Sequence, residues 1–364
     1  MRGRQVFMES LLAHDVEFIF GNPGTTENAV VDGMVDYPDL SFVLALHEGV
    51  ALAAATFYAQ ASGNTAVVNL HAAPGLGNAI GLIFGALRAN APMVVTAGQQ
   101  DIRMRLREPV LSHDLVSMAS SVTKWSAQVE RADEMSLAMR RAFKIAAAPP
   151  RGPVFLSLPM DVMEEETTIT AVGPGGTLSQ GAADPTAFQN AADLLAGADH
   201  PIIVAGDNVA QAGADGAVAK LAEAAGAQVW FEPSRARQPL DSTHPAVRGS
   251  LPFDTLATRA IFDEGDVFLL IGGRFFEELW FDGGGVFPEG GKIIEIEESH
   301  GSLAHSHAAD VGLIGDLGAT ASALADSLAG KVGEASERLA TMGEAKAKKA
   351  PSNPPALPGG GVHI

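Results

Sequence analysis

Short apolar runs alternate with helix-like segments along the first half of the chain. The strands that these runs predict lie at residues 16–20, 41–46, 65–70, 92–97 and 153–158. Segments with a helical spacing of apolar residues lie between them, at 4–14, 47–60, 78–89 and 135–147. Strands that alternate with helices of this length are typical of crossover units, which build parallel sheets. We therefore predict an α/β domain with a doubly wound parallel sheet over residues 1–165.

The pattern lapses at 166–186, where Thr, Gly, Ser and Pro predict a linker. It then resumes and predicts a second doubly wound, Rossmann-like α/β domain over residues 187–330. Its expected strands are 201–205, 228–231, 266–271, 292–296 and 311–314, and its expected helices are 188–196, 217–225 and 319–328. The remaining segment, 331–364, is rich in Lys, Ala and Glu and then in Pro and Gly, so we expect a flexible tail.

Composition supports two buried parallel sheets and narrows the functional classes. Hydrophobic residues make up 47% of the chain, charged residues 18% and aromatic residues 6%, as expected where strands are buried on both faces. The net charge of −19 disfavours nucleic acid and anionic membranes as partners. The absence of cysteine excludes disulfides and thiolate chemistry. With no apolar run long enough to span a membrane, we expect a cytoplasmic protein.

Glu48 is the first candidate for chemistry. It directly follows the apolar run FVLAL and precedes GVALAAATFYA, so it lies at a strand–helix junction. In a parallel sheet the carboxyl ends of the strands face the ligand crevice. Burial there is expected to raise the pKa of Glu48, as suits a proton donor or a partner for a ligand nitrogen. The alternative is a helix-terminal carboxylate that is favoured by the helix dipole.

His71 occupies the equivalent point one crossover later, between TAVVNL and a Gly/Pro segment at 71–77 that we expect to be a loop. An acid and an imidazole at the ends of successive strands suggest a site, although a single strand-end histidine is more often structural. The turn GNPGTTE offers Thr25 and Thr26, which either cap the next helix or hold a ligand carboxylate.

Two further patterns are weak. Gly75, Gly77 and Gly81 imitate a dinucleotide fingerprint, but the spacing is GxGxxxG and no ribose-binding acid follows the next strand, so an NAD-dependent oxidoreductase is a distant alternative. Three histidines in ESHGSLAHSHAAD suggest a metal site, yet the neighbouring acids lie in a surface-like loop. We therefore assign no metal ligands in this chain.

Several motifs occur together in a fixed order. They are GNPGTTE, ALHEGVALAAATFYAQASG, NLHAAPGLGNAIG, PMVVTAGQQ, KWS, GPVFLSLP and, in the second domain, FEPSRARQPLDSTHPAVRG. As an ensemble they resemble thiamine-diphosphate-dependent 2-oxo-acid decarboxylases and acetolactate-synthase-like enzymes, with the benzoylformate decarboxylases as the nearest branch. The resemblance extends through both predicted domains. It implies that the first binds the pyrimidine of thiamine diphosphate and that the second is the central domain.

The resemblance also implies roles for individual residues. Glu48 matches the glutamate that hydrogen-bonds the aminopyrimidine ring and promotes its imino tautomer, which takes the thiazolium C2 proton. His71 matches a histidine that assists proton transfers and favours a decarboxylase over an acetolactate synthase. Thr25 stands where the family has a serine that contacts the substrate carboxylate, and the added methyl group alters that pocket. The cofactor-binding positions that the resemblance implies are Pro23, Gly24, Glu48, Gly75 and Asn78.

A third domain of the family holds the diphosphate and magnesium through Gly-Asp-Gly and a later Asn, and no such pair occurs in this sequence. We therefore expect the N-terminal and central portion of a non-oxidative 2-oxo-acid decarboxylase, inactive without a diphosphate-binding domain, which a separate subunit could supply. The resemblance also implies a homodimer or higher oligomer through the pyrimidine domain. The alternatives are an acetolactate-synthase-like carboligase and a non-catalytic dimerisation partner of a longer relative.

Overall fold

A computed structural model of the chain describes residues 1–175, 183–276 and 283–349. The chain divides into two compact units, residues 1–178 and 179–364, each of which is described here by itself. Among the described residues, no helix combines the length and the apolar character that a membrane crossing requires.

The first unit contains a six-stranded sheet with the order β2-β1-β3-β4-β6-β5, in which every pair of neighbours is parallel. Its strands are β1 (Phe18–Asn22), β2 (Ser41–Leu44), β3 (Ala66–Leu70), β4 (Met93–Gln99), β5 (Ser126–Gln128) and β6 (Pro153–Pro159). Its α-helices are α1 (Gly3–Leu12), α2 (Asn28–Gly33), α3 (Glu48–Ser62), α4 (Ala72–Arg88), α5 (Leu115–Ser120), α6 (Met135–Ala147) and α7 (Met160–Glu164). Short 3₁₀ turns lie at Thr25–Glu27, Met34–Asp36, Ile102–Arg107 and Ala132–Glu134.

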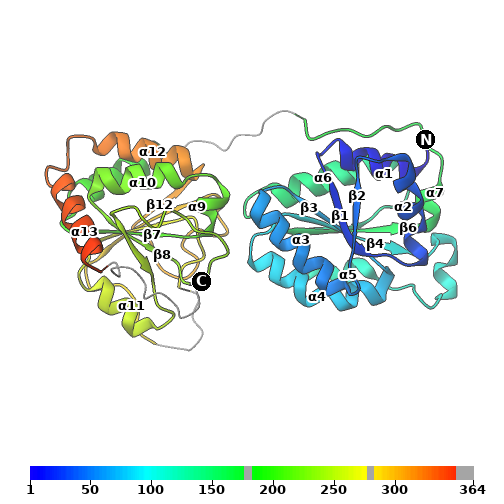
Figure 1. Cartoon of the computed structure of the whole chain (residues 1–364), viewed down its shortest axis with the longest axis horizontal. Coiled ribbons are helices and arrows are strands. Elements are labelled where there is room, and N and C mark those ends of the chain that lie inside the picture. Colours follow the sequence, from blue (N-terminus) through cyan, green and yellow to red (C-terminus); the bar gives the residue numbers. More distant parts are fainter. Residues whose placement is uncertain (176–182, 277–282, 350–364) are drawn as a thin grey trace, which may run out of the picture. The chain divides into compact units, whose positions relative to one another are not determined.

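Helices cover both faces of this sheet (Figure 1). One apolar core joins α1, α2 and α6 to the sheet, and a second joins α3, α4 and α5 to its other face. The central strands β3, β4 and β6 are buried at every residue, which explains their continuous apolar sequence. The doubly wound parallel sheet predicted for this part of the chain is confirmed.

The start of α4 differs from the prediction. The segment 71–77 was expected to be a loop because it contains Pro74 and two glycines, but the helix begins at Ala72. Pro74 falls in the first turn, where a backbone N–H has no intrahelical partner in any case, so the ring costs no hydrogen bond. The loop prediction was therefore wrong, and the glycines lie inside the helix.

The second unit contains another six-stranded parallel sheet, with the order β12-β11-β10-β7-β8-β9. Its strands are β7 (Pro201–Ala205), β8 (Gln228–Phe231), β9 (Val247–Ser250), β10 (Val267–Ile271), β11 (Lys292–Glu297) and β12 (Val311–Ile314). Its helices are α8 (Pro185–Ala196), α9 (Asp207–Gln211), α10 (Asp215–Ala225), α11 (Thr255–Phe262), α12 (Leu317–Leu328) and α13 (Ala335–Lys349). The helices α10 and α12 lie on one face and α11 on the other (Figure 1).

The predicted flexible tail at 331–364 was wrong in part, because Ala335–Lys349 forms the helix α13. The helix packs on α10: an added Cβ on Gly226, at the end of α10, would lie 2.8 Å from the Cα of Ala335. Residues 350–364 lie outside the described residues.

Candidate functional site

The candidate site lies at the carboxyl ends of β1 and β3, which are neighbours in the sheet. The helix after β1, α2, belongs to the core on one face, whereas α4, which follows β3, belongs to the core on the other face. Adjacent strands whose helices leave in opposite directions form a topological switch point, the usual place for a ligand crevice in a doubly wound sheet. Asn22 ends β1, and His71 directly follows β3.

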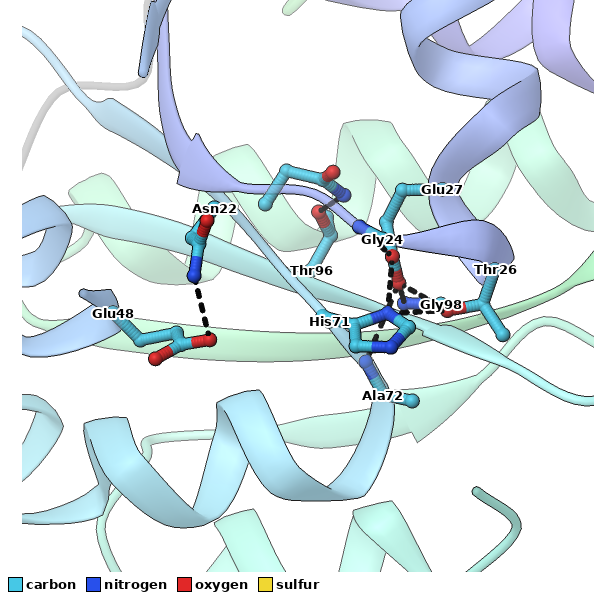
Figure 2. A network of polar contacts seen from close by, with 10 residues as sticks. Asn22, Gly24, Thr26, Glu27, Glu48, His71, Ala72, Thr96 and Gly98 are labelled. Atoms are coloured by element: carbon cyan, nitrogen blue, oxygen red, sulfur yellow. Dashed lines mark hydrogen bonds and ion pairs between the residues drawn. The ribbon is translucent and has the colours of Figure 1, made fainter. Parts of the chain in front are cut away.

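Glu48 is the first residue of α3 and is only 5% exposed. The side chain of Asn22 donates to its Oε1 at 3.2 Å, and that of Asn78, on α4, donates to its Oε2 at 3.0 Å. Each carboxylate oxygen thus has one amide donor from a different element. Figure 2 shows Asn22 reaching across to Glu48 at this edge of the sheet.

The pKa of Glu48 is shifted in the opposite direction from the sequence-based prediction. Burial raises the pKa, but the hydrogen bonds from Asn78, the backbone and Asn22, together with nearby His47, outweigh burial and leave the pKa below its ordinary value. The neighbouring apolar sequence indicates the cost of burial but not the two amides, which come from β1 and α4. Glu48 is consequently an ionised acceptor at neutral pH.

A second buried carboxylate, Glu27, was missed in the sequence. It is 1% exposed and lies at the end of the turn GNPGTTE. Five groups bond to it: the backbone N–H of Gly24, Ala72 and Gly98, the hydroxyl of Thr26 and Nδ1 of His71. These groups come from the turn after β1, the start of α4 and the end of β4, which meet around Glu27 in Figure 2. A local signal was present, since an acid three residues after Gly24 fits the capping-box spacing.

His71 and Glu48 both lie beside Gly75. A Cβ at Gly75 would be 3.2 Å from Glu48 Oε1 and 3.5 Å from the Cβ of His71. The imidazole therefore belongs to the Glu27 network, whereas Glu48 belongs to the amide network of Asn22 and Asn78. The acid and the imidazole lie at the same edge of the sheet, as predicted, but their hydrogen bonds go to other groups.

The turn after β1 supplies the other predicted positions. Gly24 must be glycine here, because a Cβ would fall 2.2 Å from Nδ1 of His71. Pro23 precedes it and is half-buried. Thr25 is exposed, while its neighbour Thr26 is buried and donates to Glu27 at 2.6 Å. The helix-capping alternative for the two threonines is wrong, because the Glu27 side chain closes this turn by accepting from Gly24 N at 2.8 Å.

The histidines proposed and then set aside as metal ligands lie in the second unit. Nε2 of His307 lies 3.1 Å from the carboxylate of Glu295, and the ring packs against Phe276 and Phe287. In the part of the chain that the structure describes, no group of three or more His, Cys, Asp or Glu side chains is arranged to hold a metal ion.

Two family models match the chain. One is described as the N-terminal TPP binding domain of thiamine pyrophosphate enzymes and matches residues 1–118. The other is described as the central domain of thiamine pyrophosphate enzymes and matches residues 188–324. The two matches fall in the first and the second compact unit respectively.

Similar proteins and structures carry related names. Benzoylformate decarboxylase of Pseudomonas aeruginosa is 32% identical over 324 residues, which are 88% of this chain and 61% of the relative. A probable acetolactate synthase large subunit of Methanocaldococcus jannaschii is 29% identical over 323 residues, which are 87% of this chain and 54% of the relative.

Among solved structures, a thiamin diphosphate-dependent enzyme of Mycobacterium smegmatis has a TM-score of 0.84 at 32% identity, covering 90% of this chain and 63% of that one. The 4-hydroxybenzoylformate decarboxylase of Rhodococcus jostii has a TM-score of 0.82 at 30% identity, with coverages of 90% and 62%. The chain thus spans about three fifths of the length of these relatives. It belongs to the thiamine pyrophosphate enzymes, of which it carries the N-terminal TPP-binding domain and the central domain.

Proposed function

We propose that this chain forms the pyrimidine-binding and central portion of a thiamine-diphosphate-dependent decarboxylase of 2-oxo acids. The observation that carries the proposal is the pairing of two networks at one switch point. Glu48 is held by Asn22 and Asn78, and His71 is held by Glu27. The name of the Pseudomonas aeruginosa relative supports decarboxylation of an aryl 2-oxo acid.

The residues present fit the pyrimidine end of thiamine diphosphate. Asn22 and Asn78 each occupy one position on a different oxygen of Glu48, so both oxygens retain lone pairs for a ring N–H. Gly75 keeps the space beside Oε1 open, because a Cβ there would lie within 3.2 Å of that oxygen. Glu48 would therefore bind and orient the aminopyrimidine ring and exchange a proton with it. When bound, the cofactor supplies the carbon nucleophile that adds to a 2-oxo acid.

His71 would serve the substrate rather than the cofactor. Its side chain is 26% exposed, and its Nδ1 is occupied by Glu27 at 2.8 Å. The ring is therefore anchored through Nδ1, and part of the side chain remains exposed. Such a group can move a proton to or from a substrate that lies over the ends of β1 and β3. The exposed hydroxyl of Thr25 lies in the same turn as Gly24 and is available for the substrate carboxylate.

The proposal is tested by phenylglyoxylate decarboxylation. Because the relatives are longer than this chain, the assay contains a separately expressed diphosphate-binding domain with thiamine diphosphate and magnesium. The Glu48→Gln variant keeps the size of the side chain but removes the carboxylate that accepts and returns a proton, and we expect its rate to fall by roughly 10²- to 10⁴-fold. Glu337→Gln, an exposed substitution on α13, serves as the matched control. Full activity in Glu48→Gln would refute the role assigned to Glu48.

Carboligation is the second candidate, favoured by the name of the Methanocaldococcus jannaschii relative. The same mixture, supplied with pyruvate alone, separates the two activities by its product. Acetolactate would identify a carboligase, whereas acetaldehyde and carbon dioxide would identify a decarboxylase.

A second copy of this chain is the partner that the first unit would accept. Four large apolar side chains of α3 and α4 are exposed, namely Val50 at 59%, Phe57 at 70%, Leu82 at 41% and Phe84 at 52%. Although the chain carries a net charge of −19, the only charged residues in these two helices are Glu48, which is buried, and Arg88 at the end of α4, which is exposed. Two copies can meet here without like-charge repulsion.

Light scattering measures this association. We expect a dimer for the unaltered chain and a monomer for Phe57→Glu. Leu256→Glu, which alters an equally exposed apolar residue on α11, should remain dimeric. A monomeric unaltered chain would contradict the proposal.

A further inference from the structure

The carboxylate of Glu27 accepts hydrogen bonds at both oxygens. Oε1 accepts from the hydroxyl of Thr26 at 2.6 Å, from Gly98 N at 2.9 Å and from Ala72 N at 3.3 Å. Oε2 accepts from Gly24 N at 2.8 Å and lies 2.8 Å from Nδ1 of His71. Three backbone N–H groups from three separate segments therefore hold this carboxylate in place, whatever the imidazole does.

These contacts determine which ring nitrogen of His71 carries the proton. Backbone N–H groups can only donate, so the carboxylate acts as an acceptor toward all of them. The Thr26 hydroxyl spends its single hydrogen on Glu27, which leaves only a lone pair facing Nδ1 of His71 at 3.2 Å. Both neighbours of Nδ1 are thus acceptors. A hydrogen on Nδ1 satisfies them, whereas a lone pair on Nδ1 would face two other lone pairs.

We propose that Glu27 is a positioning residue that fixes neutral His71 in the tautomer with its hydrogen on Nδ1, so that Nε2 is presented as a proton acceptor. When Nε2 takes a proton from a bound substrate, the ring becomes an imidazolium whose Nδ1–H still donates to Glu27. The positive charge then lies 2.8 Å from the carboxylate oxygen. The proton has moved from substrate to Nε2, and no other bond changes. This inference rests on the proposed function only for the substrate whose proton Nε2 accepts.

A purely structural role for Glu27 makes a different prediction. If Glu27 served only to satisfy the N–H groups of Gly24, Ala72 and Gly98, the tautomer of His71 would not depend on it. Because the neutral imidazole is free to carry its hydrogen on either nitrogen, the tautomer reports the contact with Glu27 directly. A stability measurement alone would not separate the two roles.

The test is nuclear magnetic resonance of the chain labelled with ¹⁵N-histidine, at about pH 8.5, above the ordinary histidine range. The signals of His71 are identified by their loss in His71→Phe. We expect the form with hydrogen on Nδ1 to exceed the other by roughly tenfold or more, as a hydrogen bond to a charged acceptor implies. If the unaltered protein shows a majority of the Nε2–H form or an even mixture, the inference is overturned.

The second measurement uses Glu27→Gln. This variant replaces one carboxylate oxygen by an NH₂ group, which is a donor and lies among the N–H groups that donate to Glu27. We expect it to abolish the preference for the Nδ1–H form. Glu48→Gln is the matched control, since it alters the other buried carboxylate of the site, and it should leave the His71 signals unchanged. A folded Glu27→Gln protein with an unaltered tautomer would refute the positioning role. The tautomer is measured without any activity assay. If the tautomer is as expected but the separate assay detects no decarboxylation, the proposed function is refuted and this inference stands.

Discussion

Asn22 and Asn78 each donate one amide hydrogen bond to Glu48, from the end of β1 and from α4. Together with a backbone hydrogen bond and nearby His47, they outweigh the cost of burial and lower the pKa of the carboxyl. Glu27 lies in the turn after β1, and its carboxylate is stabilised instead by backbone N–H groups. The two carboxylates share one edge of a sheet, but they have different partners: Glu48 accepts from two asparagine amides, and Glu27 contacts the imidazole of His71.

Removing the amide of Asn78 is expected to raise the pKa of Glu48, because the ionised form loses its strongest hydrogen-bond donor. The pKa is followed by ¹³C nuclear magnetic resonance of the carboxyl carbon during a pH titration. Asn22→Ala should shift the pKa in the same direction but less, since its contact is longer, at 3.2 Å against 3.0 Å. An unchanged pKa in Asn78→Ala would show that another group sets the ionisation of Glu48.

The sequence was sufficient to locate Glu48 and His71, because both follow apolar runs that end at the same edge of a parallel sheet. It was insufficient for Glu27, whose five partners come from segments up to 71 residues away. The direction of the Glu48 pKa shift was unpredictable for the same reason. Desolvation can be inferred from neighbouring apolar residues, but amide donors from distant strands and helices cannot.

At the scale of elements, close backbone approach explains where glycines stand. A Cβ at Gly98, in β4, would lie 2.2 Å from Oε1 of Glu27 and 2.6 Å from the hydroxyl of Thr26. This strand therefore passes directly against the Glu27 carboxylate, and its backbone N–H donates to it. By contrast, a Cβ at Gly81, in the exposed part of α4, meets nothing within 4 Å.

These two glycines are expected to respond oppositely to alanine. Gly98→Ala should destabilise the first unit by about 1–3 kcal/mol, because the added methyl group forces Glu27 out of its place. Gly81→Ala should stabilise it by roughly 0.5–1 kcal/mol through the better helix propensity of alanine. Urea unfolding followed by circular dichroism gives both values. A Gly98→Ala protein as stable as the unaltered chain would mean that Glu27 is not held tightly.

Element type was largely predictable from the sequence, whereas element starts and short elements were not. The buried runs of β3, β4 and β7 were evident because central parallel strands are apolar throughout. The short elements β5, β9 and α5 have no such run and were missed. In α4 the glycines and Pro74 concealed the start of the helix: it was predicted over 78–89, but it begins at Ala72, against the site.

The second unit contains two buried glutamates, Glu232 and Glu297, that lie outside the candidate site of the first unit. Burial raises the pKa of Glu232 to about 7, with the charge of Asp207 adding to it. Burial also raises the pKa of Glu297 to about 8, against the opposing hydrogen bond from Gly273 N at 2.9 Å. Both carboxyls lie close to Gly273: its N–H donates to Glu297, and an added Cβ would fall 2.6 Å from Glu232 Oε2.

The stability of the second unit should therefore fall as pH rises. In the unfolded chain both acids titrate near 4.5, whereas the folded unit retains their protons up to about pH 7–8. The folded state binds more protons across this window, so its stability is full below pH 4.5 and is lost as pH rises through the folded pKa values. Between about pH 5 and pH 8.5 we expect a loss of several kcal/mol, since each unit of pKa shift corresponds to about 1.4 kcal/mol.

Urea unfolding measures this slope when it is followed by the fluorescence of Trp230 in a Trp125→Phe, Trp280→Phe background, which keeps one of the three tryptophans. Glu297→Gln should remove much of it, because a neutral amide has no proton to lose. Glu337→Gln, at an exposed position of α13, should leave the slope unchanged. A stability that rises between about pH 5 and pH 8.5 would contradict the burial argument.

We propose that Glu48 acts on the pyrimidine ring of thiamine diphosphate. The most direct test is the rate at which the thiazolium C2 proton exchanges with deuterium in the chain complemented by a diphosphate-binding domain, at saturating cofactor and without substrate. We predict that Glu48→Gln slows this exchange by roughly 10²-fold or more, while Glu337→Gln leaves it unchanged. Equal exchange rates in Glu48→Gln and the unaltered chain would contradict the claim.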